Sequence, residues 1–235
     1  MSNHKGFTLV ELMVALGVCI IIIGAIYAAV TTGQRSSSAM LQKVVAHQDA
    51  RAALELMAMD TQMASFNPTR AQAADFWKTG ACAASSNQNN LGIQEATATS
   101  ITVEMDADMS GIIGAPAPNE VIRYAYLPSA TDQRITRETN CGGAQPFLGS
   151  PTAGEKTVKV INDVNGNGTM DAGDTPIFRY FDAQGNPITT AAGIPNIARI
   201  EITLSVETED KAADTGQPRK MIYSTSIIPR NHVIR

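Results

Sequence analysis

The longest apolar stretch of the chain lies at its amino end and contains a single charge. From Leu12 to Val30 no side chain is charged, and Glu11 is the only charged residue between Phe7 and Val30. A helix formed by Leu12–Val30 would span roughly 28 Å, close to the hydrocarbon thickness of a bilayer. Because a carboxylate within such a segment is costly, Glu11 is expected to have a function and a partner of opposite charge.

A second, amphipathic segment follows the polar residues 31–38. Its apolar side chains recur every three or four residues up to about Phe66, and Asn67-Pro68 is expected to stop the helix because the residue before proline disfavours the α region. We therefore predict one helix from Phe7 to Phe66, roughly 90 Å long, with Gly33 as its weakest point. The stripe predicted to pack on the rest of the protein is Leu41, Val45, Gln48, Ala52, Leu56, Met59 and Met63. The predicted opposite face carries Lys43, His47, Asp49, Arg51 and Asp60.

The remainder of the chain alternates polar and apolar residues, which is the pattern of β-strands. A loop or short helix is expected at 69–90, around Phe76-Trp77, and loops are expected at 111–118 and 145–154. This order predicts an α+β fold, in which one long N-terminal helix packs on a mostly antiparallel β-sheet. The expected strands, of which the second and third form a hairpin, are 100–105, 120–126, 133–138, 157–161, 176–181, 197–206 and 221–228.

Composition and charge indicate where the chain resides. The sequence has 235 residues and a net charge of −4, so nothing in it suggests binding to nucleic acid. Beyond the helix about 170 residues remain, enough for one hydrophobic core. His4 and Lys5 precede the apolar segment and favour a cytoplasmic amino end. The head, residues 67–235, is then expected beyond the inner membrane, in the periplasm or outside the cell.

The three cysteines fit an oxidising compartment. Cys19 lies in the apolar helix, whereas Cys82 and Cys141 both lie in polar segments of the head. We expect Cys82 and Cys141 to form a disulfide, which would stabilise the head by about 3–4 kcal/mol in the chain-entropy model. Two free thiols are the alternative. The sequence has no CxxC pair, so neither a redox motif nor a zinc site is indicated.

An acidic loop at residues 163–174 has the spacing of a calcium loop. Oxygen-bearing residues stand at places 1, 3, 5, 9 and 12 of the EF-hand pattern, and glycine stands at place 6. Because place 12 is an aspartate and strands rather than helices flank the loop, we expect weak binding and no true EF-hand. The loop is more similar to the calcium loops of dockerins, and a metal-free turn is the alternative. The expected ligands are Asp163, Asn165, Asn167, Thr169 through its carbonyl, Asp171 and Asp174.

The first residues resemble a known leader. Lys5-Gly6-Phe7-Thr8-Leu9-Val10-Glu11 and the apolar run behind them are similar to the class III leader of type IV pilins and type II secretion pseudopilins. The resemblance implies that a prepilin peptidase cleaves between Gly6 and Phe7 and methylates the new amine of Phe7. In a filament, Glu11 of one subunit would then pair with the Phe7 amine of its neighbour, since opposite charges attract strongly in a low dielectric.

Two simpler interpretations compete with the prepilin leader. One is a secretory signal peptide, but no clean small-residue cleavage site follows the apolar run, and an acid near its start is unusual. The other is a plain single-pass anchor. The pilin interpretation divides the chain into a leader at 1–6, a long helix at 7–66 with residues 7–30 as transmembrane segment and filament core, and a head at 67–235.

The head resembles one branch of the same superfamily, more diffusely. The turn at Tyr180–Gly185, the alternating strand after it and the end of the last strand at Pro229-Arg230-Asn231 are similar to PilW-like minor pilins and J-type pseudopilins. The resemblance implies a minor, initiating or tip-proximal type IV pilus subunit, or alternatively a J-type pseudopilin of a type II secretion system. Its expected partners are other pilins or pseudopilins, the prepilin peptidase and the inner-membrane assembly platform.

An enzyme is not expected. The chain has no GxSxG or HExxH motif, and neither His47 nor His232 stands at a useful spacing from a nucleophile. A calcium-dependent adhesive head is a further possibility that is compatible with the pilin interpretation.

Overall fold

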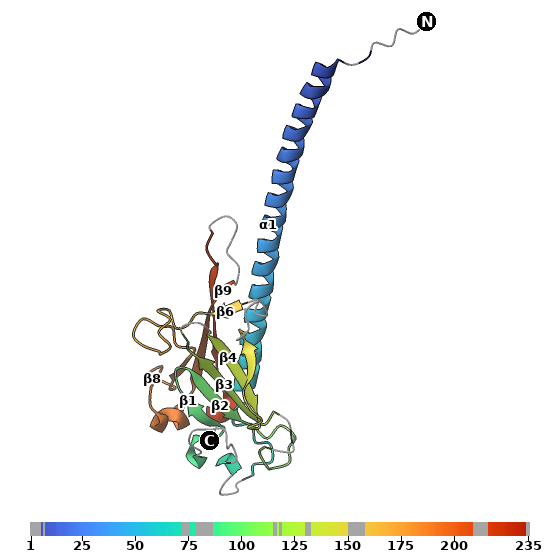
Figure 1. Ribbon diagram of the computed structural model, residues 1–235. Coiled ribbons are helices and arrows are strands. Elements are labelled where there is room, and N and C mark those ends of the chain that lie inside the picture. The colour runs from blue at the N-terminus through green and yellow to red at the C-terminus, as the bar shows by residue number, and fades with distance from the viewer. Residues whose placement is uncertain are drawn as a thin grey trace.

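The computed structural model describes residues 6, 8–71, 76–78, 87–114, 117, 119–129, 133–149, 158–208 and 216–233. It consists of the long helix α1 (Leu9–Gln62) and a β-rich head. In Figure 1 the first half of α1 extends away from the head, and the second half lies along it. The α+β fold predicted from the sequence is confirmed.

Two antiparallel sheets, rather than the single sheet expected, form the head. The first contains, in spatial order, β1 (Ile93–Ala96), β2 (Ser100–Glu104), β3 (Val121–Leu127), β4 (Arg134–Thr139) and β5 (Gln145–Leu148). In the second, β10 (Lys220–Ile227), β9 (Arg199–Thr208), β7 (Phe178–Phe181) and β8 (Pro187–Ile188) follow in order, and β6 (Val158–Val160) also pairs with β9. The short helices are η1 (Phe76–Lys78), η2 (Gln88–Asn90), η3 (Ala191–Asn196) and α2 (Arg230–Val233).

The strand predictions were correct for the long strands and wrong at the sheet edges. The seven expected strands correspond to β2, β3, β4, β6, β7, β9 and β10, and the hairpin of β3 and β4 is present. Residues 145–154 were expected to be a loop, but β5 begins there and pairs with β4. Leu148 is buried, and Phe147 lies edge-on to Tyr124 with ring centroids 5.1 Å apart. Packing of these two side chains therefore outweighs the weak strand pattern around Pro146.

Helix α1 is continuous through Gly33, so the expected weak point is fully helical. It ends at Gln62, slightly before the predicted Phe66, because the chain turns there toward the first sheet. The Ser65 N–H donates to the Glu104 carbonyl at 2.9 Å, in place of a helical acceptor. Ser65 adopts a left-handed conformation with φ 65°, which redirects the backbone.

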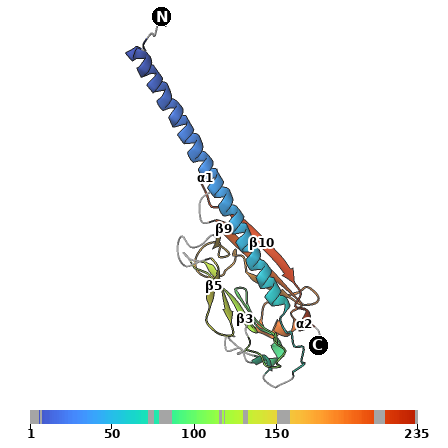
Figure 2. The ribbon, with the colours of Figure 1, turned by 90° about the vertical axis from the view of Figure 1, so that its right-hand side faces the viewer.

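The face of α1 that was predicted to pack on the head is not the face that does so in the structure. Leu41 and Met59 of that stripe are 65% and 61% exposed, and Ala52 is also exposed. Figure 2 shows α1 lying beside β9 and β10. Small side chains dominate the buried face because they let the helix backbone lie close to the sheets. The residues of α1 that are buried against the head are Ala46, Ala50, Ala53, Leu54, Met57 and Thr61.

Two polar residues expected on the opposite face also contact the head. The Asp60 carboxylate accepts a hydrogen bond of 2.6 Å from the Tyr124 hydroxyl and pairs with Arg137 at 3.1 Å. Burial and the neighbouring Asp60 raise the pKa of Tyr124. His47 Nδ1 lies 2.7 Å from the Tyr223 hydroxyl on β10. These contacts connect the outer half of α1 to both sheets.

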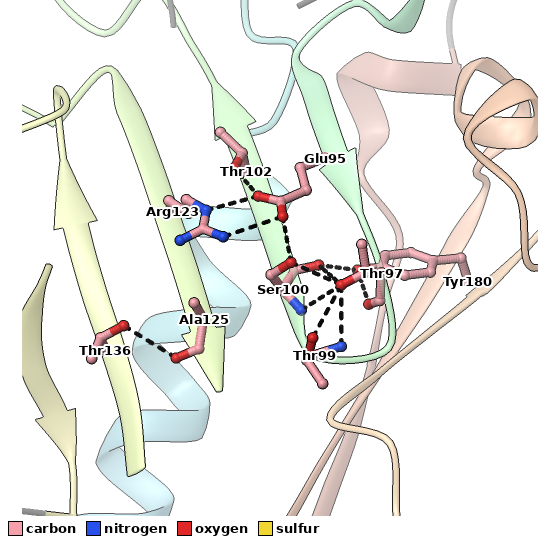
Figure 3. Close-up of polar contacts among 9 residues, drawn as sticks. All are labelled: Glu95, Thr97, Thr99, Ser100, Thr102, Arg123, Ala125, Thr136 and Tyr180. Carbon is pink, nitrogen blue, oxygen red and sulfur yellow. Dashed lines mark hydrogen bonds and ion pairs between the residues drawn. The ribbon is translucent and has the colours of Figure 1, made fainter. Parts of the chain in front are cut away.

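A charged network links the first three strands of the first sheet (Figure 3). The Glu95 carboxylate on β1 receives hydrogen bonds from Arg123 Nε at 2.8 Å, from the Ser100 hydroxyl at 2.6 Å and from the Thr102 hydroxyl at 2.9 Å. Tyr180 of the second sheet donates to the Ser100 carbonyl at 3.0 Å. The network therefore fixes β1 to β2 and β3 and connects the two sheets at this end of the head.

The observed face of α1 can be tested by enlarging one alanine. We expect Ala50→Leu to lower the free energy of unfolding by about 1–3 kcal/mol, because the larger side chain overpacks the contact with the head. Ala52→Leu, on the face predicted wrongly from sequence, should change it by no more than about 0.5 kcal/mol. Urea unfolding of the detergent-solubilised protein measures both. A larger cost at Ala52 than at Ala50 would contradict the observed orientation.

The Glu95 network predicts a pH-dependent stability. Burial opposes ionisation of Glu95, but hydrogen bonds from Arg123, Ser100 and Thr102 outweigh it and lower the pKa of Glu95. Its contribution is therefore present above the unfolded pKa of about 4.3 and is lost as the pH falls through the lower folded value. Glu95→Gln should cost about 1–3 kcal/mol at neutral pH, with the difference from wild type shrinking in acid.

The matched control is Glu55→Gln, which removes an exposed helical pair with Arg51. It should cost no more than about 0.5 kcal/mol at any pH. Unfolding free energies measured across the acid range distinguish the two variants, and a pH-independent cost of Glu95→Gln would contradict the role given to its charge.

Candidate functional site

The beginning of α1 is organised around the Glu11 carboxylate. Thr8 is the N-cap of the helix, and its N–H and hydroxyl both donate to Glu11 Oε2 at 2.9 Å. In return, the Glu11 N–H donates to the Thr8 hydroxyl at 3.3 Å. This reciprocal arrangement is a capping box. Its sequence signal is the Thr-x-x-Glu spacing, which the sequence-based prediction did not include. No hydrogen bond to Glu11 Oε1 is present among the described residues.

The apolar part of α1 is not buried against the described part of the head. All side chains from Leu9 to Val30 are exposed, and the first buried residue of the helix is Ala46. Among the described residues, α1 is the one helix long and apolar enough to cross a membrane. Its exposed large side chains include Leu9, Val10, Leu12, Met13, Val14, Leu16, Ile20, Ile21, Ile23, Ile26 and Tyr27. An apolar surface of this extent indicates a membrane or protein contact.

The acidic loop at 163–174 is held at both ends by the two sheets. The Asp163 N–H donates to the Tyr126 hydroxyl at 2.8 Å, and Gln133 Nε2 donates to the Asp163 carbonyl at 2.8 Å. Asn162, just before the loop, donates to the carbonyls of Thr175 and Thr203 at 2.9 and 3.0 Å. The loop therefore has a fixed base, and its expected ligands are presented from that base.

The side chains of the loop accept hydrogen bonds from its own backbone, as a calcium loop requires. Asp163 accepts from the N–H groups of Gly166 and Gly168 at 2.7 and 2.8 Å. Asn165 and Asn167 each accept from the N–H two residues further on, at 2.9 and 2.8 Å. These bonds orient the oxygens at places 1, 3 and 5.

The aspartates at places 9 and 12 of the loop also accept hydrogen bonds within it. Asp174 accepts from the N–H groups of Asp171 and Val164 at 2.9 and 2.8 Å, and these bonds lower the pKa of Asp174. Asp171 accepts from the side-chain amides of Asn165 and Asn167, at 3.1 and 2.7 Å. In the described part of the chain, carboxylate oxygens of the three aspartates do not all lie within 4.8 Å of one another. The all-oxygen donor set suits calcium, but binding would require the two amides to release Asp171.

Comparison with known proteins identifies the amino end. A family model described as the prokaryotic N-terminal methylation motif matches residues 1–27. The chain carries the leader of type IV pilins and pseudopilins. No curated protein and no solved structure matches the chain. The motif implies a pilin-like or pseudopilin subunit that assembles with other pilins, and the exposed apolar helix fits a membrane-anchored pilin. Proteins of this type are generally structural.

The remaining predicted site residues of this pilin-like subunit are only partly described. Gly6 is exposed, but Phe7 lies outside the described residues, so cleavage and methylation there remain predictions. Cys141 is disulfide-bonded, whereas Cys82 lies outside the described residues, and the pairing of these two cysteines also remains a prediction. Cys19 is a free, exposed cysteine within the apolar helix.

The two histidines considered for catalysis have structural contacts in the pilin-like subunit. His47 contacts Tyr223, as described above. His232 is 1% exposed, and its Nδ1 lies 2.8 Å from the Ser65 hydroxyl while its Nε2 lies 2.9 Å from the Ile194 carbonyl. It thereby fixes the C-terminal helix α2 to the turn after α1 and to η3.

Proposed function

We propose that the chain is a minor, initiating or tip-proximal subunit of a type IV pilus, assembled through α1 after cleavage between Gly6 and Phe7. The observation that carries the proposal is the methylation leader joined to a helix whose apolar half is entirely exposed. Before assembly this half would lie in the inner membrane with the head in the periplasm. Afterwards it would lie among the helices of neighbouring subunits, delivered by the assembly platform.

The capping box prepares Glu11 for a partner on another subunit. Glu11 Oε2 is engaged by Thr8 within the same subunit, and Oε1 has no hydrogen bond among the described residues. Cleavage would create a positively charged, methylated amine on Phe7. In the apolar core of a filament, the Phe7 amine of one subunit and Oε1 of the next would attract strongly, since little water screens them.

The outer half of α1 supplies further apolar surface for neighbours. The bulky residues of the stripe that was predicted to be buried face away from the head instead. Their exposure supports a second contact between subunits, beyond the membrane segment, because isolated apolar stripes of this length are uncommon on free surfaces. The exposed apolar residues of this half are Met40, Leu41, Val44, Val45, Met59 and Met63.

A minor role is favoured over a major one by the size of the head. Two five-stranded sheets and long connections form a wide head that would pack poorly in thousands of identical repeats. A J-type pseudopilin of a type II secretion system shares the same leader and helix and is the alternative. Deletion of the gene separates the two, because loss of surface filaments supports the pilus subunit and loss of secreted proteins supports the pseudopilin.

We further propose that the 163–174 loop binds calcium weakly. The oxygens of Asp163, Asn165 and Asn167 are already oriented by backbone N–H groups, and both ends of the loop are fixed to the sheets. Bound calcium would recruit Asp171 and Asp174 and neutralise the loop's three aspartates. Affinity in the range of extracellular modules is expected, because aspartate at place 12 has a shorter arm than glutamate.

Glu11→Gln tests the assembly mechanism. Glutamine at this position still completes the capping box but removes the charge, so the helix, membrane insertion and cleavage should be retained. Incorporation into filaments should fall about tenfold or more, because loss of one ion pair worth at least about 1.4 kcal/mol changes an equilibrium by that factor. Immunoblotting of sheared filaments against whole cells measures the ratio.

Glu55→Gln, a change of the same chemistry on the exposed outer half of α1, is the control and should be incorporated normally. Mass spectrometry of the mature wild-type protein should find methylated Phe7 as the first residue. An amino terminus at Met1 or well beyond Phe7, or full incorporation of Glu11→Gln, would overturn the proposed assembly.

Asp171→Asn tests the calcium loop. Asp171 is exposed and its carboxylate accepts from the side-chain amides of Asn165 and Asn167, so its substitution should leave the metal-free fold intact. Millimolar calcium should raise the melting temperature of the wild type, and this shift should decrease in Asp171→Asn because one ligand is lost. Asp182→Asn, which changes a turn aspartate outside the 163–174 loop, should respond like the wild type. Equal shifts in all three proteins would remove the proposal.

A further inference from the structure

A second group of carboxylates lies in the connection between β2 and β3, away from the 163–174 loop. Oxygens of Asp106, Asp108 and Glu120 all lie within 4.8 Å of one another. Asp106 and Glu120 are 0% exposed, whereas Asp108 reaches the surface. Two buried carboxylates and a third beside them repel one another strongly when ionised, because the surroundings have a low dielectric constant.

Backbone N–H groups hold the Glu120 carboxylate in the centre of this connection. Its Oε1 accepts from Ala107 and Asp108 at 3.0 and 3.3 Å, and its Oε2 accepts from Gly114 at 2.9 Å. The connection therefore wraps around a buried carboxylate.

The two oxygens of the Asp106 carboxylate differ in their hydrogen bonding. Its Oδ2 accepts from the Thr69 hydroxyl and the Gly111 N–H, both at 3.1 Å. Its Oδ1 is buried and has no hydrogen-bond partner. A buried carboxylate oxygen without a partner is rare in native structures and costs several kcal/mol unless a ligand satisfies it.

No basic side chain compensates these charges in the described part of the chain. The ion pairs found there involve Glu55, Glu95, Asp60, Glu207 and Glu201, and none includes a member of the group. The buried oxygens of Asp106 and Glu120 therefore lie close together without a basic side chain beside them among the described residues.

We infer that Asp106, Asp108 and Glu120 bind a calcium ion. Hard carboxylate oxygens without histidine or cysteine favour calcium over zinc, and magnesium would demand a more regular octahedral set. Asp106-x-Asp108-x-Ser110-Gly111 repeats the opening half of a calcium loop, with oxygens at places 1, 3 and 5 and glycine at place 6. Gly111 has φ 77°, the left-handed conformation that this turn needs. Glu120, at the entry to β3, then supplies the closing carboxylate.

The ion would fasten the far end of α1 to the head. The Asp106 N–H donates to the Phe66 carbonyl at 2.8 Å, and Thr69 contacts the Asp106 carboxylate. On the other side, Ile113 packs with Phe76, Trp77 and Val121 in a small hydrophobic cluster separate from the main core. Calcium would therefore add a further link among three segments that already contact one another: the turn after α1, the β2–β3 connection and the start of β3.

Trp77 gives this site its own spectroscopic signal. It is the only tryptophan of the chain, and it packs in the cluster that contains Ile113 and Val121, the residue after Glu120. In the detergent-solubilised full-length protein, treated with chelator, terbium(III) should emit when excited through Trp77, and calcium should displace it. Asp108→Asn is the chosen variant because Asp108 is exposed and asparagine keeps the oxygen that accepts from the Ser110 N–H at 2.9 Å.

Asp108→Asn should weaken displacement of terbium by calcium about tenfold or more, whereas Asp171→Asn, in the 163–174 loop, should change it less than about twofold. Both variants should melt like the wild type without metal, which verifies their folds. Absence of tryptophan-sensitised emission, or equal calcium competition in both variants, would overturn the inference.

Discussion

One helix has to fit two different surroundings, and the rest of the architecture follows from this constraint. Along the head, α1 buries a face from Ala46 to Thr61 against the sheets, whereas between Leu9 and Val30 all its side chains are exposed. Water is an unfavourable final environment for so much apolar surface. A bilayer before assembly and neighbouring helices afterwards both supply apolar surroundings, so the same sequence suits both stages. In the proposed assembly, the Glu11 charge would then favour a filament core, where it finds a counter-ion, over lipid.

The same constraint explains why the outer half of α1 could be predicted to be an amphipathic helix, but not which of its faces packs on the head. A bulky apolar stripe ordinarily marks the buried face, and that rule selected Leu41, Val45 and Met59. In the structure the alanine-rich face lies against the sheets, since small side chains allow close approach of the backbone. The bulky stripe is left exposed, which is the basis for proposing that it contacts a neighbouring subunit. A sequence pattern shows that a face is apolar, but the partner it packs against is set by the tertiary structure.

Sequence patterns correctly predicted the features that are determined by residues close together in the sequence. The leader, the long helix and the long alternating strands such as β9 and β10 depend on residues close in sequence, and they were predicted correctly. The edge strand β5 was missed because its stability comes from Phe147 and Leu148 packing on other elements. The Asp106–Asp108–Glu120 group was missed for a related reason. Its connection looked like a plain Gly/Pro loop, and the register that pairs Glu104 with Val121 brings Glu120 back to Asp106.

The two acidic loops show that a strong motif and a strong physical need for a cation are separate properties. The 163–174 loop has the more complete spacing, yet its aspartates are satisfied by backbone N–H groups and by the amides of Asn165 and Asn167. The Asp106 group has the weaker motif, but it contains a buried oxygen with no partner and no neighbouring positive charge among the described residues. Desolvation makes an uncompensated buried carboxylate far more costly than an exposed one. A bound cation would therefore stabilise the fold more at the Asp106 group, although the sequence alone favours the other loop.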